Sequence, residues 1–175
     1  MNLRTERLII RDFEKEDWKE VYKYTSQETV MEYMPEGVLT QEETKKFIRE
    51  NMGASAKKFP VILIDKKILI GHIEFFKYFG EHSYEIGWAF NPEYYNKGYA
   101  SEAALALLKY GFEVLELHRI VATCQPENVP SYRVMEKIGM RREGYFKKCI
   151  PHGDGWWDEY SYGILEEEWK NDNIE

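Results

Sequence analysis

Residues Asn91–Ala103 have the sequence NPEYYNKGYASEA, which joins a strand-like run to a run of helix-forming residues. The pair Asn91-Pro92 signals a turn, and Gly98 stands where the helix should begin. The first N–H groups of a helix lack partners within it, and a residue without Cβ lets an anion approach them closely. The stretch therefore predicts a diphosphate site at a strand-to-helix turn. The alternative is an ordinary turn in which the glycine only relieves backbone strain.

The length of 175 residues predicts a single domain over 1–175 that buries its own core. The net charge of -7 disfavours nucleic acid as a partner, because phosphate binding by a nucleic-acid-binding protein requires an excess of clustered positive charge. An anionic ligand must then be held locally, by a site such as the predicted turn.

The sequence contains two cysteines, Cys124 and Cys149, and shows neither a secretory leader nor a long apolar span. We therefore expect a cytoplasmic protein with reduced thiols and no membrane association. The four histidines are scattered without the spacing of metal ligands, so we predict no metal site.

The hydrophobic patterns along the chain predict an α+β fold. Strands are expected at 4–13, 59–65, 68–76, 82–90, 118–124, 140–150 and 156–165, and helices at 15–25, 40–52, 101–114 and 131–138. The strands from 59 to 90 should form an antiparallel meander, and the segment 82–124 should be a right-handed strand-helix-strand crossover. The result would be a mixed, mostly antiparallel central sheet flanked by helices.

A second informative segment, residues 118–140, has the sequence HRIVATCQPENVPSYRVMEKIGM. The chain should leave a strand at Cys124, turn, and start a helix at Ser131, which we predict to be the N-cap after Pro130. The G-x-G-x-x-G and G-x-x-x-x-G-K-[ST] patterns do not occur in the sequence, so Rossmann and P-loop nucleotide sites lack their residues.

Taken together, YEIGWAFNPEYYNKGYASEA (84–103) and the segment 118–140 resemble the GNAT superfamily of acyl-CoA-dependent N-acetyltransferases. The similarity is to its ribosomal-protein alanine acetyltransferase (RimJ/RimL-like) branch, and it extends from TERLIIRDF (5–13) to EEEW (166–169). The resemblance implies a GNAT-type fold whose crossover forms the CoA site. It also implies an acetyl-CoA-dependent transferase in which a primary amine attacks the thioester directly, in a ternary complex and without a metal.

The resemblance places the family's pyrophosphate loop, usually Gln/Arg-x-x-Gly-x-Gly/Ala, on residues 95–100, with the backbone of 96–101 around the CoA diphosphate. Asn128 would bind the pantetheine arm, and a backbone N–H near Trp88 or Ala89 would hold the oxyanion. Tyr95 replaces the usual Gln or Arg, and Asn96 stands where a glycine is common. The residues assigned to acetyl-CoA are Trp88, Ala89, Tyr95, Asn96, Lys97, Gly98, Tyr99, Ala100, Ser101, Asn128 and Ser131.

Acetyl transfer requires a neutral amine, whereas an α-amine has a pKa of about 8 and a lysine about 10, so a base must remove a proton. Glu85 is the first candidate, because strand alternation places it with the small residues Gly87 and Ala89 on one face. The alternative is a solvated strand glutamate without a catalytic role. Asp158 and Glu159 on the last predicted strand are further candidates.

A proton for the departing CoA thiolate could come from Ser131, at the second helix mouth, or from Tyr132. Many superfamily members have a tyrosine at the position of Met135, so that acid must be replaced or unnecessary. The alternative for Ser131 is a helix cap alone. These residues form the catalytic hypothesis: Glu85, Ser131 and Asp158.

Two functional classes remain open at this stage. The first is an acetyl-CoA:amine N-acetyltransferase whose acceptor is a ribosomal-protein N-terminus or a small cationic amine, which the acidic net charge would attract. The second is a CoA-binding regulatory module that has lost catalysis, which Met135 makes conceivable. In either class the protein could be a monomer or a homodimer.

Overall fold

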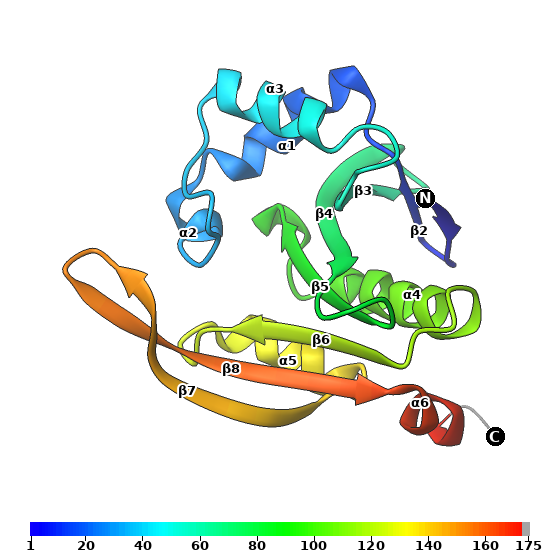
Figure 1. Cartoon of the computed structure of the whole chain (residues 1–175). Helices are drawn as coiled ribbons and strands as arrows, with labels where there is room; N and C mark the ends of the chain where they lie inside the picture. Colours follow the sequence, from blue (N-terminus) through cyan, green and yellow to red (C-terminus); the bar gives the residue numbers. More distant parts are fainter. Residues whose placement is uncertain (173–175) are drawn as a thin grey trace. The chain divides into compact units, whose positions relative to one another are not determined.

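The computed structural model describes residues 1–172 and has an α+β architecture, a mixed sheet flanked by helices, as expected (Figure 1). By their contacts the residues form two compact units. The first unit comprises Met1–Phe75 and Trp88–Ala106, and the second comprises Phe76–Gly87 and the chain from Leu107 onward. Each unit is described separately below, and the single domain over 1–175 stays a prediction.

The first unit contains an antiparallel array of strands. These are β1 (Asn2–Arg4), β2 (Leu8–Arg11), β3 (Lys58–Leu63) and β4 (Ile68–Lys77), and each pairs antiparallel with the next. Leu8 and Ile10 are fully buried, as the alternation predicted. The single strand expected at 4–13 is wrong, because the chain turns after Arg4, where the Thr5 N–H donates to the Leu8 carbonyl at 2.9 Å, and pairs β1 with β2.

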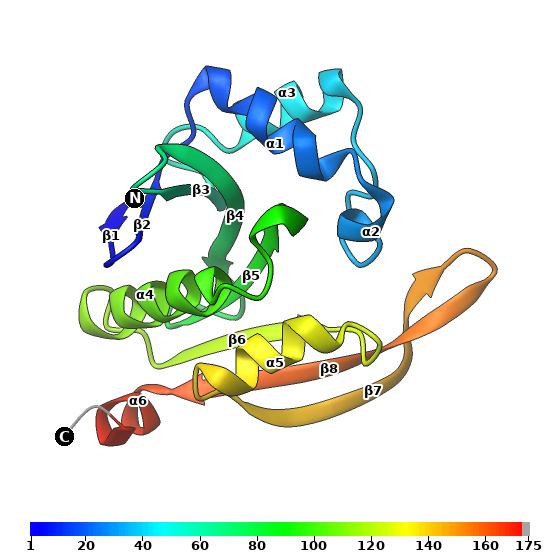
Figure 2. The ribbon, with the colours of Figure 1, turned by 180° about the vertical axis from the view of Figure 1, so that it is seen from behind.

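The helices of the first unit cover one side of the β3–β4 pair, with α1 and α3 side by side (Figures 1 and 2). They are η1 (Lys15–Asp17), α1 (Trp18–Thr25), α2 (Glu28–Met31) and α3 (Gln41–Glu50). The predicted capping box of α3 is present, since the Thr40 hydroxyl accepts from the Glu43 N–H and the Glu43 carboxylate accepts from the Thr40 N–H. The apolar faces of α1 and α3 close a core in which Phe13 and Phe47 meet edge to face.

The predicted strand-helix-strand unit is confirmed. It consists of β5 (Ser83–Phe90), the short helix η2 (Pro92–Tyr94), α4 (Tyr99–Glu113) and β6 (Arg119–Cys124), and β5 pairs parallel with β6. Both faces of β5 are covered at its end. Ala89 and Phe90 are both only 5% exposed, because Phe90 packs against Gly71 of β4, where its ring and the Ala89 carbonyl fill the space that a Cβ would need.

The second unit is built on a long antiparallel hairpin of β7 (Arg141–His152) and β8 (Gly155–Leu165), and β8 also pairs antiparallel with β6 (Figure 2). Its helices include α5 (Val129–Lys137) and α6 (Glu166–Asp172). Gly139, with φ of 87°, follows α5 as predicted for a residue that ends a helix. Within residues 1–172 no helix is both long and apolar enough to cross a membrane.

Candidate functional site

The loop before α4 has an unusual backbone. Asn96 and Gly98 both have left-handed φ values, 58° and 79°, on either side of Lys97, and α4 begins at the next residue, Tyr99. The helix mouth is therefore at Gly98, as predicted. The glycine also relieves strain, because an L-residue with a side chain rarely adopts this φ. The relief of strain is thus an observed role of Gly98, whereas the diphosphate site stays a prediction.

The rest of this loop belongs to the same unit. Tyr95 and Lys97 are exposed, and Lys97 Nζ donates to the Glu93 carbonyl at 2.7 Å, which holds its ammonium on the preceding 3₁₀ turn. Ser101, in the first turn of α4, is buried. Two further residues assigned to acetyl-CoA, Trp88 and Ala89, lie on β5, where Ala89 is part of the core.

In the second unit, Glu85 lies at the last paired position of the parallel strands, opposite Val121. Beyond this pair both β5 and β6 continue. Thr123 of β6 donates a hydrogen bond from Oγ1 to Glu85 at 3.3 Å. The Glu85 carboxylate is half-buried rather than fully solvated, which favours a defined role over a freely solvated strand glutamate.

Glu159 of β8 approaches the same threonine. Burial raises the pKa of Glu159, and a hydrogen bond with Thr123 partly opposes this. The structure thus gathers Glu85 and Glu159 around Thr123, a residue that the sequence analysis missed. The signal was available in the sequence RIVATC of β6. Thr123 is the hydroxyl residue of this strand and stands one residue before its end.

Asp158 has other partners. It accepts a hydrogen bond from the Tyr145 hydroxyl and one from the Lys148 N–H at 2.7 Å. The hydrogen bond from Tyr145, and after it the one from Lys148, lowers the pKa of the Asp158 carboxyl. Lys148 has a left-handed φ of 51° and lies in an irregular stretch of the β7–β8 pairing, so Asp158 stabilises this bulge.

The start of α5 differs from the prediction. The helix begins at Val129 with Asn128 in the N-cap position, so the prediction of Ser131 as N-cap is wrong, and Ser131 lies inside the first turn. Pro130 is tolerated there because a first-turn residue needs no N–H for the helix. Within the part of the chain that the structure describes, the Asn128 side chain makes no capping hydrogen bond to α5.

Ser131 contacts the thiol of Cys124 instead. Burial raises the pKa of Cys124 to about 12, against hydrogen bonds with the Ser131 side chain and the Tyr132 backbone. Tyr132 packs edge to face against Tyr160, with ring centroids 5.9 Å apart. Met135 is 1% exposed and belongs to the core.

Comparison with known proteins identifies the family. Residues 7–141 match the family described as the acetyltransferase (GNAT) domain. A Bacillus subtilis (strain 168) protein named as an uncharacterized N-acetyltransferase, YnaD, is 68% identical over 97% of this chain and 99% of its own length. The chain belongs to the GNAT acetyltransferase family.

Solved structures agree with this assignment. A GNAT-family acetyltransferase from Bacillus anthracis is 70% identical, with a TM-score of 0.93 over 95% of this chain and 99% of the other. A spermidine N-acetyltransferase from Vibrio cholerae, solved with CoA and spermine, shares the fold at 24% identity, with a TM-score of 0.82 over 95% of this chain and 100% of the other. The protein is thus an N-acetyltransferase that uses acetyl-CoA as its cosubstrate.

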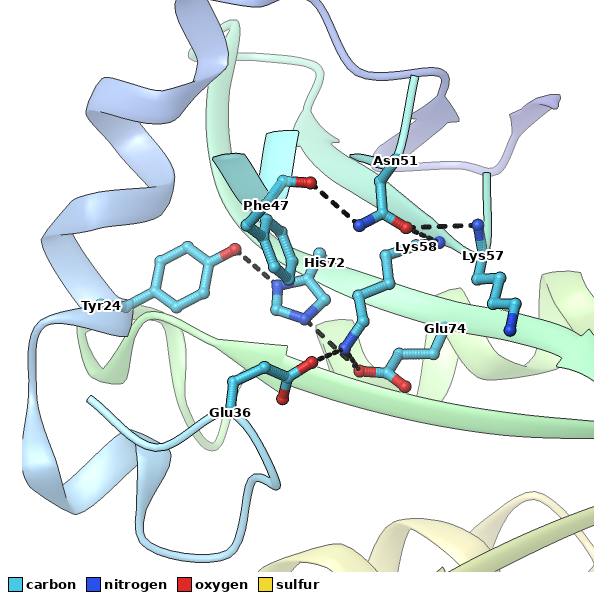
Figure 3. Close-up of polar contacts among 8 residues, drawn as sticks. All are labelled: Tyr24, Glu36, Phe47, Asn51, Lys57, Lys58, His72 and Glu74. Carbon is cyan, nitrogen blue, oxygen red and sulfur yellow. Dashed lines mark hydrogen bonds and ion pairs between the residues drawn. The ribbon is translucent and has the colours of Figure 1, made fainter. Parts of the chain in front are cut away.

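The acetyltransferase also contains a buried polar network that the sequence analysis did not recognise (Figure 3). Its centre is His72 on β4, which is 1% exposed and whose Nδ1 lies 2.8 Å from the Tyr24 hydroxyl on α1. The other ring nitrogen, Nε2, lies 3.8 Å from Oε1 of Glu74, two residues along the same strand. Lys58, directly opposite Glu74 on β3, donates to Glu74 at 2.6 Å and also pairs with Glu36.

The charges of this network are fixed by burial and by mutual contact. Burial lowers the pKa of His72 despite the attraction of Glu74, so the imidazole is neutral at pH 7. Burial alone would raise the pKa of Glu74, but contacts with His72 and Lys58 outweigh burial and hold this pKa at about 2. Burial likewise opposes the charge of Lys58, yet the two carboxylates raise its pKa. Only the i, i+2 spacing of His72 and Glu74 could have indicated this cluster in advance.

Among residues 1–172, no group of histidine, cysteine, aspartate and glutamate side chains has the arrangement of a metal site.

Proposed function

We propose that this acetyltransferase moves the acetyl group of acetyl-CoA directly to a primary amine, with Glu85 as the general base. The amine nitrogen attacks the thioester carbonyl carbon, the tetrahedral intermediate collapses, and the C–S bond breaks to release CoA as a thiolate. One proton of the substrate ammonium passes to the Glu85 carboxylate, which gives the neutral amine that attacks, and the second, lost from the nitrogen after the attack, neutralises the departing thiolate. The carrying observation is the half-buried Glu85, held by Thr123 at the end of the β5–β6 pairing.

Glu159, the second carboxylate at Thr123, is an alternative base. Burial raises its pKa, and a carboxylate of raised pKa holds an accepted proton more firmly. Asp158 remains in the hypothesis as an alternative base, although its bonds to Tyr145 and Lys148 already account for its position.

The cofactor assignments belong to the same proposal. The loop over Tyr95–Ser101 would hold the CoA diphosphate through its backbone N–H groups, Asn128 would bind the pantetheine arm, and an N–H near Trp88 or Ala89 would hold the oxyanion. A thiol of pKa about 8.5 is a tolerable leaving group near neutrality, so Ser131 or Tyr132 need give only modest assistance.

The Glu85 hypothesis predicts a pH-dependent defect. Glu85→Gln should lower kcat by about a hundredfold at pH 7, the lower end for general-base catalysis, with partial recovery at high pH where the amine is already neutral. The KM for acetyl-CoA should change little. Glu159→Gln and Asp158→Asn are the comparison variants, assayed by release of the CoA thiol across pH. If one of them shows the pH-rescued loss and Glu85→Gln does not, the base is that other carboxylate.

The acceptor is proposed as a cationic primary amine, either a protein N-terminus, as the RimJ/RimL-like resemblance suggests, or a small amine. The net charge of -7 favours a cationic partner. The spermidine acetyltransferase that shares the fold supports a polyamine as one option. A panel of peptides with free N-terminal alanine or serine, of polyamines and of aminoglycosides would rank the classes by kcat/KM. The same proposal has the enzyme act in the cytoplasm.

A second candidate function is a CoA-binding regulatory module without catalysis. It is favoured by one observation, the fully buried Met135 at the position where many superfamily members have a tyrosine acid. Calorimetric binding of CoA together with no thiol release from any amine of the panel would support the module. Turnover with any one of these amines would support the enzyme.

A further inference from the structure

We propose that Arg7, with Thr5 and Glu102, anchors the loop before α4, so that Arg7 is a positioning residue for acetyl-CoA. The inference rests on the proposed assignment of this loop to the CoA diphosphate. The TERL motif of the N-terminal segment, residues 5–8, then has a role that its strand pairing alone does not give it.

The anchor is centred on Glu102, in the first turn of α4. Its carboxylate accepts from the Thr5 hydroxyl at 2.6 Å, from the Arg7 N–H at 3.0 Å and from Arg7 Nε at 2.6 Å. Burial would raise the pKa of Glu102, but the bonds from Thr5 and Arg7 hold this pKa below its ordinary value. The carboxylate is therefore ionised and joins the turn between β1 and β2 to the start of α4.

Arg7 extends this connection to the loop itself. Its NH1 donates to the carbonyl of Lys97 at 3.1 Å, and its guanidinium carbon lies 4.6 Å from the centre of the Tyr99 ring. Its NH2 is the atom that a Cβ on Gly98 would meet, at 3.5 Å. One side chain thus contacts Lys97 and Tyr99, on either side of the left-handed Gly98.

The loop needs such support for a conformational reason. Asn96 and Gly98 are left-handed, and fixing one residue in a single backbone conformation costs about 1–2 kcal/mol of conformational entropy. A loop already ordered before the ligand arrives spares this cost on binding. The hydrogen bond from Arg7 to the Lys97 carbonyl fixes the residue between the two left-handed positions.

Arg7 has an electrostatic role as well. Glu102 is favourable at a helix N-terminus in isolation, but its negative charge would repel a diphosphate bound there. The Arg7 guanidinium pairs with Glu102 at 2.6 Å and neutralises this charge.

The geometry distinguishes a positioning residue from a phosphate ligand. Nε and NH2 of Arg7 face Glu102, and NH1 faces the Lys97 carbonyl. All three nitrogens of the Arg7 guanidinium therefore face protein atoms. Arg7 acts on the ligand through the loop and not by direct contact.

The test compares two acyl donors, acetyl-CoA and acetyl-pantetheine, of which only the first carries the diphosphate. Arg7→Gln should raise the KM for acetyl-CoA about tenfold, a loss of ~1.4 kcal/mol, with kcat within about twofold. The kcat/KM for acetyl-pantetheine should not change. Arg7→Lys should recover only part of the loss, because an ammonium can pair with Glu102 but cannot bridge it to Lys97 as a planar fork does.

Arg11→Gln is the matched control, since Arg11 also lies near the N-terminus and pairs with a carboxylate, but its hydrogen bonds go to Asp17 and to the Asp12 carbonyl rather than to the loop. Arg11→Gln should leave the ratio of kcat/KM for acetyl-CoA to kcat/KM for acetyl-pantetheine unchanged. Equal losses of Arg7→Gln with both donors, or no loss with either, would overturn the anchor.

A third variant separates this inference from the function on which it rests. Gly98→Ala should also reduce the preference for acetyl-CoA over acetyl-pantetheine. If Gly98→Ala leaves that preference intact, the diphosphate assignment of the loop fails. If Gly98→Ala reduces it and Arg7→Gln does not, only the anchor fails.

Discussion

Two clusters in the first unit use the same chemistry, a carboxylate held by a basic side chain, but the basic side chain is far more exposed in one than in the other. In the loop anchor, the Arg7 side chain is 42% exposed and the Glu102 side chain 18%. In the His72 network, the Lys58 side chain is 13% exposed, Glu74 is 15% exposed and His72 is 1% exposed (Figure 3). We infer that the same kind of ion pair serves positioning in the first cluster and stability in the second.

The physical reason lies in the solvent. An exposed ion pair is screened by water and contributes little to stability, typically less than about 1 kcal/mol, so its value is in the geometry that it fixes. A buried pair that loses one member leaves an uncompensated charge in a medium of low dielectric constant, which costs several kcal/mol. The predictions below test this contrast.

The largest effect is expected from Lys58→Met. Removing the ammonium leaves Glu36 and Glu74 facing each other without a cation, so the free energy of unfolding should fall by about 3 kcal/mol. Urea denaturation would measure this loss. Lys46→Met is the control, because Lys46 pairs with Glu50 on the surface of α3, and it should cost less than about 0.5 kcal/mol. Similar losses in the two variants would remove the contrast between buried and exposed pairs.

A smaller effect, on ligand binding, is expected from Gly98→Ala. The new side chain would occupy a left-handed conformation and shift the loop, so the Kd for CoA should rise about tenfold, or ~1.4 kcal/mol. Gly53→Ala is the control for backbone strain, since Gly53 has a φ of 86° and no atom near the place of a Cβ. It should lower the free energy of unfolding about as much as Gly98→Ala does, without changing the Kd for CoA. Calorimetry with CoA gives both Kd values. An unchanged Kd in Gly98→Ala would show that the loop does not bind the cofactor.

The smallest effect is a pH dependence that belongs to His72. Its pKa is lowered in the native protein, so as pH falls below about 6.5 the unfolded chain takes up the proton first and stability declines. Between pH 6.5 and 5.5 the loss of stability should be at most about 1 kcal/mol, the limit for an imidazole that stays neutral throughout this range in the folded protein. Glu74, with a pKa of about 2 against an ordinary 4.5, adds a further loss only as pH falls below about 4.5. The two windows are therefore separate.

The variant His72→Asn tests this assignment. It should flatten the dependence of the free energy of unfolding on pH between 6.5 and 5.5, whatever its effect on stability at pH 7. His82→Asn, at an exposed histidine, is the control and should keep the slope of the wild type. If His72→Asn retains the full slope, another group is responsible for it.

Much of the fold was predictable from local sequence. The aromatic and β-branched runs of β3, β4 and β5 and the Thr40–Glu43 capping box specify their elements within a few residues, because hydrophobic period and capping chemistry are local properties. The position of Gly98 at the helix mouth was predictable for the same reason. The start of α5 was not, since both Asn128 and Ser131 are good N-caps and Pro130 is tolerated in a first turn.

The sequence by itself determined the family, the order of the elements and the candidate residues Glu85, Asn128 and Gly98, since short motifs carry these. Tertiary structure alone decided which side chains meet over long separations. Arg7 reaches Glu102 across 95 positions, and Tyr24 reaches His72 across 48. Such contacts depend on strand register and helix packing, which are set by the whole core, so no local pattern identifies Glu102 as the partner of Arg7 or Tyr24 as the partner of His72.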